Sequence, residues 1–389
     1  MKIWFLVRWL PPHIDGVGDY AWNLTHALRK CGIDVCVFTS EEQKTKGLEN
    51  NEWVFPVIKQ WQPRAIVKSI KAVTGHHTPD WLSLQYVPQM YNRWGIAWHI
   101  ADILRALKKE FRCKTVVTFH EFIWQWGWGI KDIFLASITR LQTKRILSFT
   151  DSAITTCPRY KDALQCLLPH PLPIATIPVG SNIESVIIAP EGLMALRKQI
   201  FPAGAKVFGL FSRLAPPKNF PFAIRALQRA RHEGLDAWLY LLGRVELSNP
   251  ELFKDLMQLA DDLGVKSYIA TSGELSKENL SIRLKMVDVF IFPQTDGIST
   301  RNTVLMAAMA HGLPLVSFKP QPGNFDNFHI PCGVLADRGD EEGFIKAAVD
   351  CLKKSGNLSE AASVNSDYYY KNFSWSIIAK KYLQALEAR

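Results

Sequence analysis

Short apolar runs alternate with longer amphipathic stretches along the whole chain. In the first half the apolar runs read as strands, at residues 2–10, 34–39, 53–58, 81–87, 114–119, 152–156 and 174–178. The stretches between them have apolar residues at helical spacing, at residues 20–30, 63–73, 96–111, 130–149 and 158–168. Strands that alternate with helices in this way are typical of a parallel sheet covered by helices. We therefore expect an α/β fold.

The second half begins the same alternation again. Strands are predicted at residues 206–211, 238–242, 289–292 and 315–318, and helices at residues 220–233, 250–263, 304–311 and 341–354. A chain of 389 residues, 48% of them hydrophobic, is long enough to fill two domains of ordinary size. We place the boundary near residue 185, so that 1–185 and 186–371 are the two Rossmann-like domains.

The loop after the strand at 289–292 is the first candidate site. Pro293 ends this strand, and the helix at 304–311 follows. A loop at the carboxyl end of a parallel strand and at a helix N-terminus is where open α/β sheets bind anionic ligands. Four of its residues can cap the helix and leave its amide groups directed at a ligand: Ser299, Thr300, Asn302 and Thr303.

A glycine loop follows the first strand of the chain. Gly16-x-Gly18-x-x-Ala21 formally matches the dinucleotide-binding fingerprint. In that fingerprint the first glycine follows the strand directly, whereas here a segment with two prolines intervenes, so NAD binding is the weaker interpretation. We expect a flexible loop whose backbone amides at Gly16, Val17 and Gly18 approach a phosphate or a sugar.

Composition narrows the choice of partners. The net charge is +10, and residues 51–150 alone hold 14 Lys and Arg against six Asp and Glu. Eleven of the 13 tryptophans precede residue 130. A basic, Trp-rich first half suits nucleic acid, an anionic membrane or an acidic substrate. Since no nucleic-acid-binding motif is visible, we favour the last two.

The basic helix at 63–73 is a candidate for contact with an anionic membrane. One face holds the apolar residues and the other holds the cations: Ile66, Val67, Ile70 and Val73 on the first, and Arg64, Lys68 and Lys71 on the second. Such a helix either lies on an anionic membrane surface or is an ordinary solvated helix. The apolar start of the chain is too short for a signal peptide, and no run approaches the roughly twenty apolar residues of a membrane span.

The cysteines indicate a reducing compartment. Seven of them are scattered along the chain, an odd number without a CxxC pair. This pattern is typical of reduced thiols in a cytoplasmic protein without a structural metal. We expect a cytoplasmic protein, peripheral on the inner face of the membrane if the basic helix binds lipid.

The segment from Pro293 to Pro314 resembles the donor-binding motif of the GT-B retaining glycosyltransferases of family 4, also called glycosyl transferases group 1. There the pattern is Pro-Ser, Glu-Gly-Phe-Gly, Leu-Glu-Ala-Met-Ala and Gly-hydrophobic-Pro. Here the matching residues are Pro293, Asp296-Gly297, Met306-Ala307-Ala308-Met309-Ala310 and Gly312-Leu313-Pro314. The resemblance implies two Rossmann-like domains facing a cleft. It also implies that a last helix at about 372–389, opened by Phe373-Ser374-Trp375, packs back on the first domain.

The resemblance also assigns roles at the donor site. The segment Ser212-Arg213-Leu214-Ala215-Pro216-Pro217-Lys218-Asn219 is similar to the family's Gly-Arg-Leu-x-x-x-Lys-Gly, whose Arg and Lys bind the donor diphosphate. Arg213 and Lys218 stand at the matching positions, and two such cations suit a pyrophosphate. In the family the loop equivalent to Gly16–Gly18 also faces the diphosphate. Further donor contacts are implied for Gly243, Gly273, Glu274, Leu275, Gly297, Ile298, Ser299, Thr300 and Thr303.

A histidine and a Trp-rich loop complete the predicted site. His120 follows the strand at 114–119, where the family has a His beside the transferred sugar; a purely structural His is the alternative. Indole faces stack on sugars, so the loop beyond it is a candidate for the acceptor, although a local hydrophobic cluster would have the same composition. The acceptor contacts that we predict are Asp19, Glu121, Trp124, Trp126 and Trp128.

Together these features predict a retaining glycosyltransferase of cell-surface polysaccharide or glycoconjugate biosynthesis. A UDP- or GDP-sugar is the expected donor, the acceptor is a glycan, a lipid-linked sugar or a small molecule, and neither a metal nor a tightly bound cofactor is expected. The expected catalytic residues are His120, Arg213, Lys218 and Asp296.

The chain departs from the family pattern at both glutamates. Asp296 replaces the first and can position sugar hydroxyls with a shorter arm, whereas Ala307 replaces the second and cannot bind the nucleotide ribose. Arg301 and Asn302 rebuild the loop. The alternatives are a GT-B protein that binds nucleotide-sugar or glycan without transfer, and a GT-B sugar-nucleotide epimerase, which would need more carboxylates.

Overall fold

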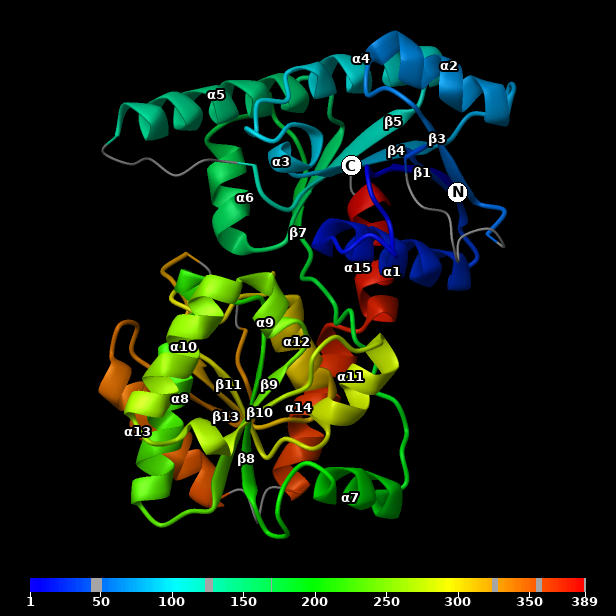
Figure 1. Cartoon of the computed structure of the whole chain (residues 1–389). Coiled ribbons are helices and arrows are strands. Elements are labelled where there is room, and N and C mark those ends of the chain that lie inside the picture. Colours follow the sequence, from blue (N-terminus) through cyan, green and yellow to red (C-terminus); the bar gives the residue numbers. More distant parts are fainter. Residues whose placement is uncertain (43–50, 123–128, 169, 324–327, 355–358, 388–389) are drawn as a thin grey trace. The chain divides into compact units, whose positions relative to one another are not determined.

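The computed structural model describes residues 1–42, 51–122, 129–168, 170–323, 328–354 and 359–387. The chain forms two compact units, and each is described here by itself. Unit 1 comprises Met1–Val179 and Trp375–Arg389, and unit 2 comprises Gly180–Ser374. Each unit is a parallel sheet with helices on both faces (Figure 1).

Unit 1 is built on a seven-stranded sheet in the order β3-β2-β1-β4-β5-β6-β7. Its strands are β1 (Lys2–Leu6), β2 (Asp34–Ser40), β3 (Val54–Ile58), β4 (Trp81–Tyr86), β5 (Lys114–Phe119), β6 (Ser152–Thr155) and β7 (Ile174–Thr176). Strand β1 pairs with β2 on one side and with β4 on the other. The strand order reverses between β1 and β4. This position is the topological switch point, where doubly wound sheets bind ligands.

Helices cover both faces of the sheet of unit 1. On one face lie α2 (Pro63–Thr74), α4 (His99–Phe111) and α5 (Ile130–Leu147); on the other lie α1 (Gly16–Lys30) and α15 (Trp375–Glu387) (Figure 1). The shorter helices α3 (Pro88–Tyr91) and α6 (Pro158–Gln165) follow β4 and β6. The last helix is tied to the sheet, because the Tyr382 hydroxyl lies 2.7 Å from Ser83 Oγ.

Unit 2 repeats the arrangement with six parallel strands in the order β10-β9-β8-β11-β12-β13. The strands are β8 (Lys206–Phe211), β9 (Ala237–Leu242), β10 (Ile269–Thr271), β11 (Val289–Phe292), β12 (Leu315–Phe318) and β13 (Gly333–Ala336). Strand β8 pairs with β9 and with β11, so the switch point of this sheet lies between β8 and β11. Both strands are followed by loops predicted to bind the donor.

The core of unit 2 lies between the sheet and three helices. Alternate strand residues such as Leu239 and Leu241 are fully buried against α8 (Phe220–His232), α10 (Pro250–Asp262) and α13 (Glu341–Lys354). On the other face α12 (Thr303–Ala310) packs against α14 (Ser359–Asn372). The remaining helices are α7 (Pro190–Lys198), α9 (Val245–Ser248) and α11 (Lys277–Leu284), with single 3₁₀ turns at Pro216–Lys218 and Lys266–Tyr268.

Among the predicted boundaries, those of the first helix and the first strand differ from the structure by four residues each. The first helix begins at Gly16 rather than at Tyr20, because Asp15 caps it by accepting a hydrogen bond from the Gly18 amide at 2.7 Å. The predicted glycine loop is therefore the first turn of a helix. The first strand ends at Leu6 rather than at Leu10, although the Arg8 carbonyl still accepts bonds from Ser40 and Thr39 of β2.

Candidate functional site

The carboxyl edge of the sheet of unit 2 brings most of the predicted donor residues together. The loops after β8 and β11 meet at the switch point and are joined by several hydrogen bonds, of which three are 2.9 Å or shorter. Lys218 Nζ donates to Gln294 Oε1 at 2.6 Å, and Asn219 Nδ2 donates to the Pro293 carbonyl at 2.8 Å. The Thr295 amide donates to the Pro217 carbonyl at 2.9 Å. The two loops thus hold Lys218 in one place.

Lys218 lies in a partly buried, positively charged environment. Burial, and then the charge of Arg301, lower the pKa of Lys218, whereas Asp296 opposes the shift. These three side chains therefore interact electrostatically at one end of the sheet. An ammonium that is partly desolvated beside another cation gains from an anionic ligand.

Asp296 is held by two side chains of the same loop region. Arg301 Nη2 lies 3.5 Å from Asp296 Oδ2, and Gln321 Nε2 donates to Asp296 Oδ1 at 2.7 Å. Both carboxylate oxygens therefore have a partner. We predicted Asp296 as a contact to sugar hydroxyls but did not include Arg301 or Gln321 in the site. The signal available in the sequence was a cation directly before a predicted helix N-terminus.

The backbone of this loop is tightly folded over β12. Gly297 has a φ of +68°, and a Cβ there would lie 2.0 Å from the Lys319 carbonyl oxygen. The Ile298 amide donates to the Phe318 carbonyl at 3.1 Å, and Ser299 and Thr300 are buried. Only glycine fits at position 297. The amide of Ile298 is consequently occupied by the protein itself.

The N-terminus of α12 lacks the side-chain cap that the N-terminus of α1 has. Asn302 occupies the N-cap position of α12, with Thr303 next to it, and makes no side-chain capping bond. In α1 the Asp15 carboxylate accepts from the Gly18 amide and places a negative charge at that helix end. A free first turn attracts an anion, while a carboxylate cap repels one. Of these two helices, α12 is the better anion site.

The loops after β9 and β10 extend the same edge. Gly243 and Gly273, with φ values of +82° and +63°, pair in a single β-bridge. The Gly243 amide donates to Ser272 Oγ at 2.8 Å, and the exposed Glu274 lies 3.3 Å from Arg244. Leu275, the last residue predicted here, is partly buried. These loops lie along the carboxyl edge toward β10, where a nucleotide would extend from a diphosphate at β8.

Arg213, unlike Lys218, has no side-chain partner within the part of the chain that the structure describes. It is exposed, and it makes no hydrogen bond or ion pair with any residue that the structure describes. Its neighbour Leu214 is fixed, because the Leu214 amide donates to Ser248 Oγ at 3.0 Å. Arg213 is therefore an exposed cation on an anchored loop.

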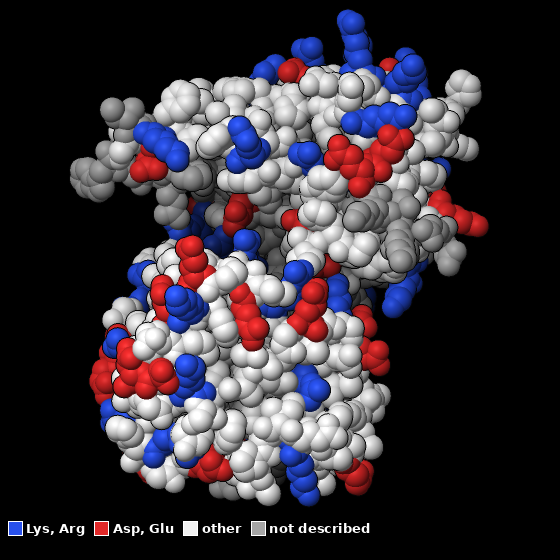
Figure 2. All heavy atoms as spheres, viewed as in Figure 1, with Lys and Arg blue, Asp and Glu red and all other residues white. Residues whose placement is uncertain are grey.

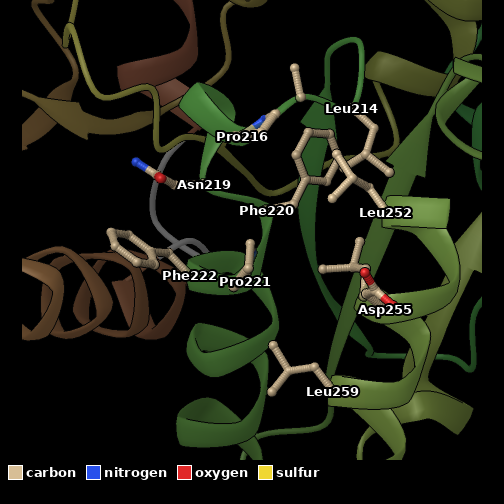
Figure 3. Close-up of a pocket in the computed structure, with 11 residues that line it drawn as sticks. Leu214, Pro216, Asn219, Phe220, Pro221, Phe222, Leu252, Asp255 and Leu259 are labelled. Atoms are coloured by element: carbon tan, nitrogen blue, oxygen red, sulfur yellow. The ribbon is translucent and has the colours of Figure 1, made fainter. Parts of the chain in front are cut away.

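A cavity of about 340 Å³ lies between this loop, the start of α8 and α10 (Figure 3). Leu214, Phe220, Leu252 and Leu259 line it, and Asp255 is its one carboxylate. None of the lining residues is a cation. The cavity is therefore unsuited to a diphosphate and is distinct from the site around Lys218.

In unit 1 the predicted glycine segment forms the first turn of α1. A Cβ on Gly18 would lie 2.6 Å from the Trp9 carbonyl oxygen, so glycine allows the helix to approach the loop after β1. Gly16 is exposed and Val17 is partly exposed. Asp19 lies in the same turn, where its amide donates to the Asp15 carbonyl at 2.9 Å. Contact of these residues with a donor remains a prediction.

His120 stands at the carboxyl end of β5 above a buried polar network. Its Nε2 lies 2.9 Å from Gln85 Oε1, and its ring makes an edge contact with Tyr20 at 4.7 Å between centroids. Gln85 Nε2 donates to Ser83 Oγ at 3.0 Å, and Ser83 in turn bonds Tyr382. Burial lowers the pKa of His120 to about 3, so the imidazole is neutral at physiological pH.

The orientation of Gln85 fixes the tautomer of His120. Since the amide nitrogen of Gln85 donates to Ser83, its oxygen is the group that faces His120 and accepts the Nε2–H. Nδ1 then keeps its lone pair. A neutral imidazole with an unprotonated Nδ1 can accept a hydrogen bond from a sugar hydroxyl.

The predicted acceptor residues of unit 1 are described only in part. Trp124, Trp126 and Trp128 lie outside the described residues. Glu121, directly after His120, is exposed. In the described part of the chain no group of three His, Cys, Asp or Glu side chains is placed to hold a metal ion. No helix among the described residues is long and apolar enough to cross a membrane.

Comparison with known proteins agrees with this geometry. The sequence model described as "Glycosyltransferase Family 4" matches residues 14–185, and that described as "Glycosyl transferases group 1" matches residues 205–354. The chain therefore belongs to the family 4, group 1 glycosyltransferases, and its two parallel-sheet units are those of the GT-B fold. It is an enzyme of the glycosyltransferase class.

The individual proteins that this chain resembles share less than 30% of its sequence. The lipopolysaccharide core biosynthesis glycosyltransferase LpsE of Rhizobium meliloti is 27% identical over 188 residues, which are 48% of this chain and about half (52%) of that protein. The structure of Anabaena HepE in complex with UDP and glucose has a TM-score of 0.72 at 18% identity and covers 100% of this chain and 99% of that one. Sucrose-phosphate synthase of Thermosynechococcus elongatus has a TM-score of 0.72 at 17% identity, with 100% and 98% covered.

Proposed function

We propose that this glycosyltransferase moves a sugar from a nucleoside diphosphate-sugar to a glycan or lipid-linked acceptor with retention of the anomeric configuration. The observation that carries the proposal is that Gln294 holds Lys218 at the switch point of unit 2, on the loop that leads from β11 to the uncapped N-terminus of α12. A diphosphate is matched by cations and by free backbone amides. Arg213, exposed and unpaired within the described structure, supplies a further cation from the same loop.

In the proposed reaction, negative charge develops on the diphosphate as the sugar leaves it. The bond between the anomeric carbon and the diphosphate oxygen breaks, and its electron pair remains on the diphosphate. The acceptor oxygen bonds to the same face of that carbon, and its proton passes to a diphosphate oxygen, so that no protein carboxylate is consumed. Fixed cations aimed at the leaving diphosphate lower the barrier. In our proposal Lys218, Arg213 and the first turn of α12 do this work without a metal ion.

His120 has a different role in this scheme. It is neutral and lies at the carboxyl end of β5, so it is suited to accept a hydrogen bond from a hydroxyl rather than to transfer a proton. We propose that it orients the transferred sugar. Asp19, Glu121, Trp124, Trp126 and Trp128 remain the predicted contacts of the acceptor.

A UDP-sugar is the donor that we propose first, because the similar HepE structure contains UDP and glucose. The similarity to LpsE supports a cell-surface glycan of the lipopolysaccharide kind as the acceptor. The direct test is to incubate the protein with several UDP- and GDP-sugars and a lipopolysaccharide core acceptor, and to determine the anomeric configuration of the product by NMR. An inverted product would overturn retention, and absence of transfer would overturn the function.

A binding-only protein is the second candidate, and one observation favours it. Asp296, which replaces the first family glutamate, is occupied by Arg301 and Gln321, and Ala307 cannot replace the second. Such a protein would bind a nucleoside diphosphate yet consume no nucleotide-sugar. Measuring binding and turnover on the same sample separates the two candidates.

We further propose that unit 1 contacts an anionic membrane through the surface formed by α4 and α5. Its exposed cations include Arg105, Lys109, Lys144 and Arg145. Its exposed large apolar side chains are Trp94, Ile133, Phe134 and Leu141. Figure 2 shows Lys and Arg side chains projecting over these helices. Apolar side chains among cations suit a lipid headgroup region.

The apolar face of α2 is not free for this purpose. Ile66 and Ile70 are fully buried, because α2 packs against α4 and β3. The exposed residues of α2 are the cations Arg64, Lys68 and Lys71 and, at its end, residues such as Val73. The predicted membrane contact is thus better assigned to α5, with α2 adding positive charge. The free thiols of all seven cysteines fit the cytoplasmic side of such a membrane.

Pelleting with anionic vesicles tests the membrane proposal. Leu141→Glu should reduce pelleting at low salt, because it puts a negative charge on the surface. Met194→Glu is the matched control, since Met194 on α7 is also 55% exposed but lies in unit 2. Equal pelleting of the wild type and both variants, or no pelleting of the wild type, would contradict the proposal.

A further inference from the structure

Asn302, the N-cap residue of α12, has partners for its backbone but none for its side chain. The Asn302 amide donates to the Ser299 carbonyl at 3.2 Å, and the Asn302 carbonyl accepts from the Met306 amide at 3.1 Å. The side chain makes no hydrogen bond to any residue that the structure describes, and its Nδ2 is buried without an acceptor. A buried donor in this state costs folding free energy, so its presence calls for an explanation.

An asparagine at an N-cap position ordinarily uses its side-chain oxygen to accept a bond from the first turn of the helix. Asn249, the N-cap residue of α10 in the same unit, does this, because its Oδ1 accepts from the Leu252 amide at 3.3 Å. At α12 no such bond forms. The amides of Thr303, Val304 and Leu305 precede the first helical bond and have no acceptor among the described residues. The start of α12 thus combines backbone donors with a side-chain donor.

A group of donors without an acceptor favours an anionic ligand that offers several oxygen atoms. The side-chain amide of Asn302 can reach such a ligand, because the residue as a whole is partly exposed and the last torsion of an asparagine side chain is broad and roughly two-fold. Rotation about this torsion brings the N–H groups of Nδ2 to the surface. The positive end of the helix disfavours these donors until an anion is bound.

We infer that Asn302 is a further donor-site residue, whose Nδ2 donates a hydrogen bond to an oxygen of the diphosphate at the first turn of α12. This inference rests on the proposed function. It adds a neutral donor to the cations Lys218 and Arg213, so that the diphosphate gains a hydrogen bond without a further charge that must be desolvated. In the free protein the cost is an unpaired amide, and the ligand removes it.

Asn302→Ala tests this role, because its effects on stability and on binding should differ. In the free protein the variant loses no side-chain hydrogen bond and no longer buries an unpaired donor, so the midpoint of thermal unfolding should stay the same or rise. The affinity for UDP should fall about tenfold or more, the usual loss for one hydrogen bond to a charged group, and that for uridine should not change. Calorimetric titration and thermal unfolding of the same samples measure both.

Asn302→Asp gives a sharper contrast. A carboxylate only accepts hydrogen bonds, so it should cap α12 as Asp15 caps α1 and raise the unfolding midpoint. The same negative charge repels a diphosphate, so UDP binding should be lost. Asn249→Ala is the matched control, since it removes an N-cap asparagine that does bond its helix. It should lower the unfolding midpoint and leave the affinity for UDP unchanged.

The outcomes separate this inference from the proposed function. If Asn302→Ala binds UDP like the wild type, or if it is destabilised in the absence of UDP as Asn249→Ala is, the inference is wrong while the proposed function stands. If the wild type binds no nucleoside diphosphate at all, the proposed function itself fails and the inference fails with it.

Discussion

The ammonium of Lys218 lies 2.6 Å from the amide oxygen of Gln294, a bond between the loops that follow the two central strands of unit 2. These loops are 76 residues apart in sequence and meet because β8 pairs with β11. The bond fixes a cation at the switch point of the sheet. It also brings Lys218 within the influence of Arg301 and Asp296.

Arg213 should be separable from Lys218 by its effect on stability. Because Arg213 is exposed and unpaired in the described structure, Arg213→Ala should leave the midpoint of thermal unfolding unchanged. Transfer should nevertheless fall by roughly a hundredfold, the size of effect expected when one fixed donor to a developing charge is removed. A steady-state assay of sugar transfer measures this. Arg225→Ala is the control, since Arg225 is an arginine of unit 2 that pairs with Glu341 at 2.7 Å. Wild-type turnover in Arg213→Ala would remove it from the site.

Gln85 should act on catalysis through His120. Gln85→Leu removes the acceptor of the His120 Nε2–H and leaves Ser83 without its donor, so stability should fall by about 1–3 kcal/mol. We expect kcat to fall at least tenfold with little change in KM for the donor.

Gln142→Leu is the matched control for Gln85→Leu. Gln142 is also a buried glutamine of unit 1, bonded to Gly95 and Ala97 rather than to a histidine. It should lose comparable stability but keep kcat. If both variants lose kcat equally, the effect is one of folding and not of histidine orientation.

Stability should decline as the pH falls below about 6.5, the ordinary pKa of histidine. Burial lowers the pKa of His120 to about 3 and that of His311 to about 4. Between these values and 6.5 the unfolded chain binds more protons than the folded one, so acid favours unfolding. Urea unfolding from pH 7.5 to 4.5 measures the slope.

His311→Asn should make this slope shallower. His311 Nδ1 donates to the Ala307 carbonyl at 2.7 Å, and the neutral ring's Nε2 accepts from Ser281 Oγ at 2.7 Å, so the variant will be less stable overall. Above pH 7 its curve should run parallel to that of the wild type, and below pH 6.5 the two should converge. An unchanged slope below pH 6.5 would contradict the assignment of a neutral His311.

Gly297→Ala should disrupt the donor loop. The added Cβ would lie 2.0 Å from the Lys319 carbonyl oxygen, and the φ of +68° strains any other residue. Gly234→Ala is the control, since Gly234 has a φ of +83° but no atom near an added Cβ. Both should lose about 1 kcal/mol from strain, and only Gly297→Ala should also lose UDP binding. Equal UDP binding in both would show that the loop tolerates displacement.

The alternation of strands and helices was predictable because the buried strands are continuous apolar runs. Val289–Phe292 is fully buried on both faces, which is the expected environment of a central parallel strand. The cations at Arg213 and Lys218 were predictable from the family resemblance. The residues around Lys218 were not predictable, because Gln294 and Arg301 come near it only when β8 and β11 pair in the folded sheet.

Other features were not predicted because they depend on polar residues that are buried and hydrogen-bonded inside the fold. Helix α14 was not predicted, and its Asn365 is fully buried with donor bonds to the Leu313 and Cys332 carbonyls at 2.8 Å. Gln85 is likewise a fully buried polar residue in a strand, with no sequence signal that links it to His120. The capping of α1 by Asp15 turned a predicted flexible loop into a helical turn.

The central claim is that the carboxyl edge of unit 2 binds a nucleoside diphosphate through Lys218. Calorimetric titration of the wild type and of Lys218→Ala with UDP, GDP, ADP and NAD, without added metal, tests it directly. We predict that one diphosphate, UDP first, binds the wild type and that Lys218→Ala remains folded but loses this binding. Equal binding of that diphosphate by Lys218→Ala, or binding of NAD in its place, would contradict the claim.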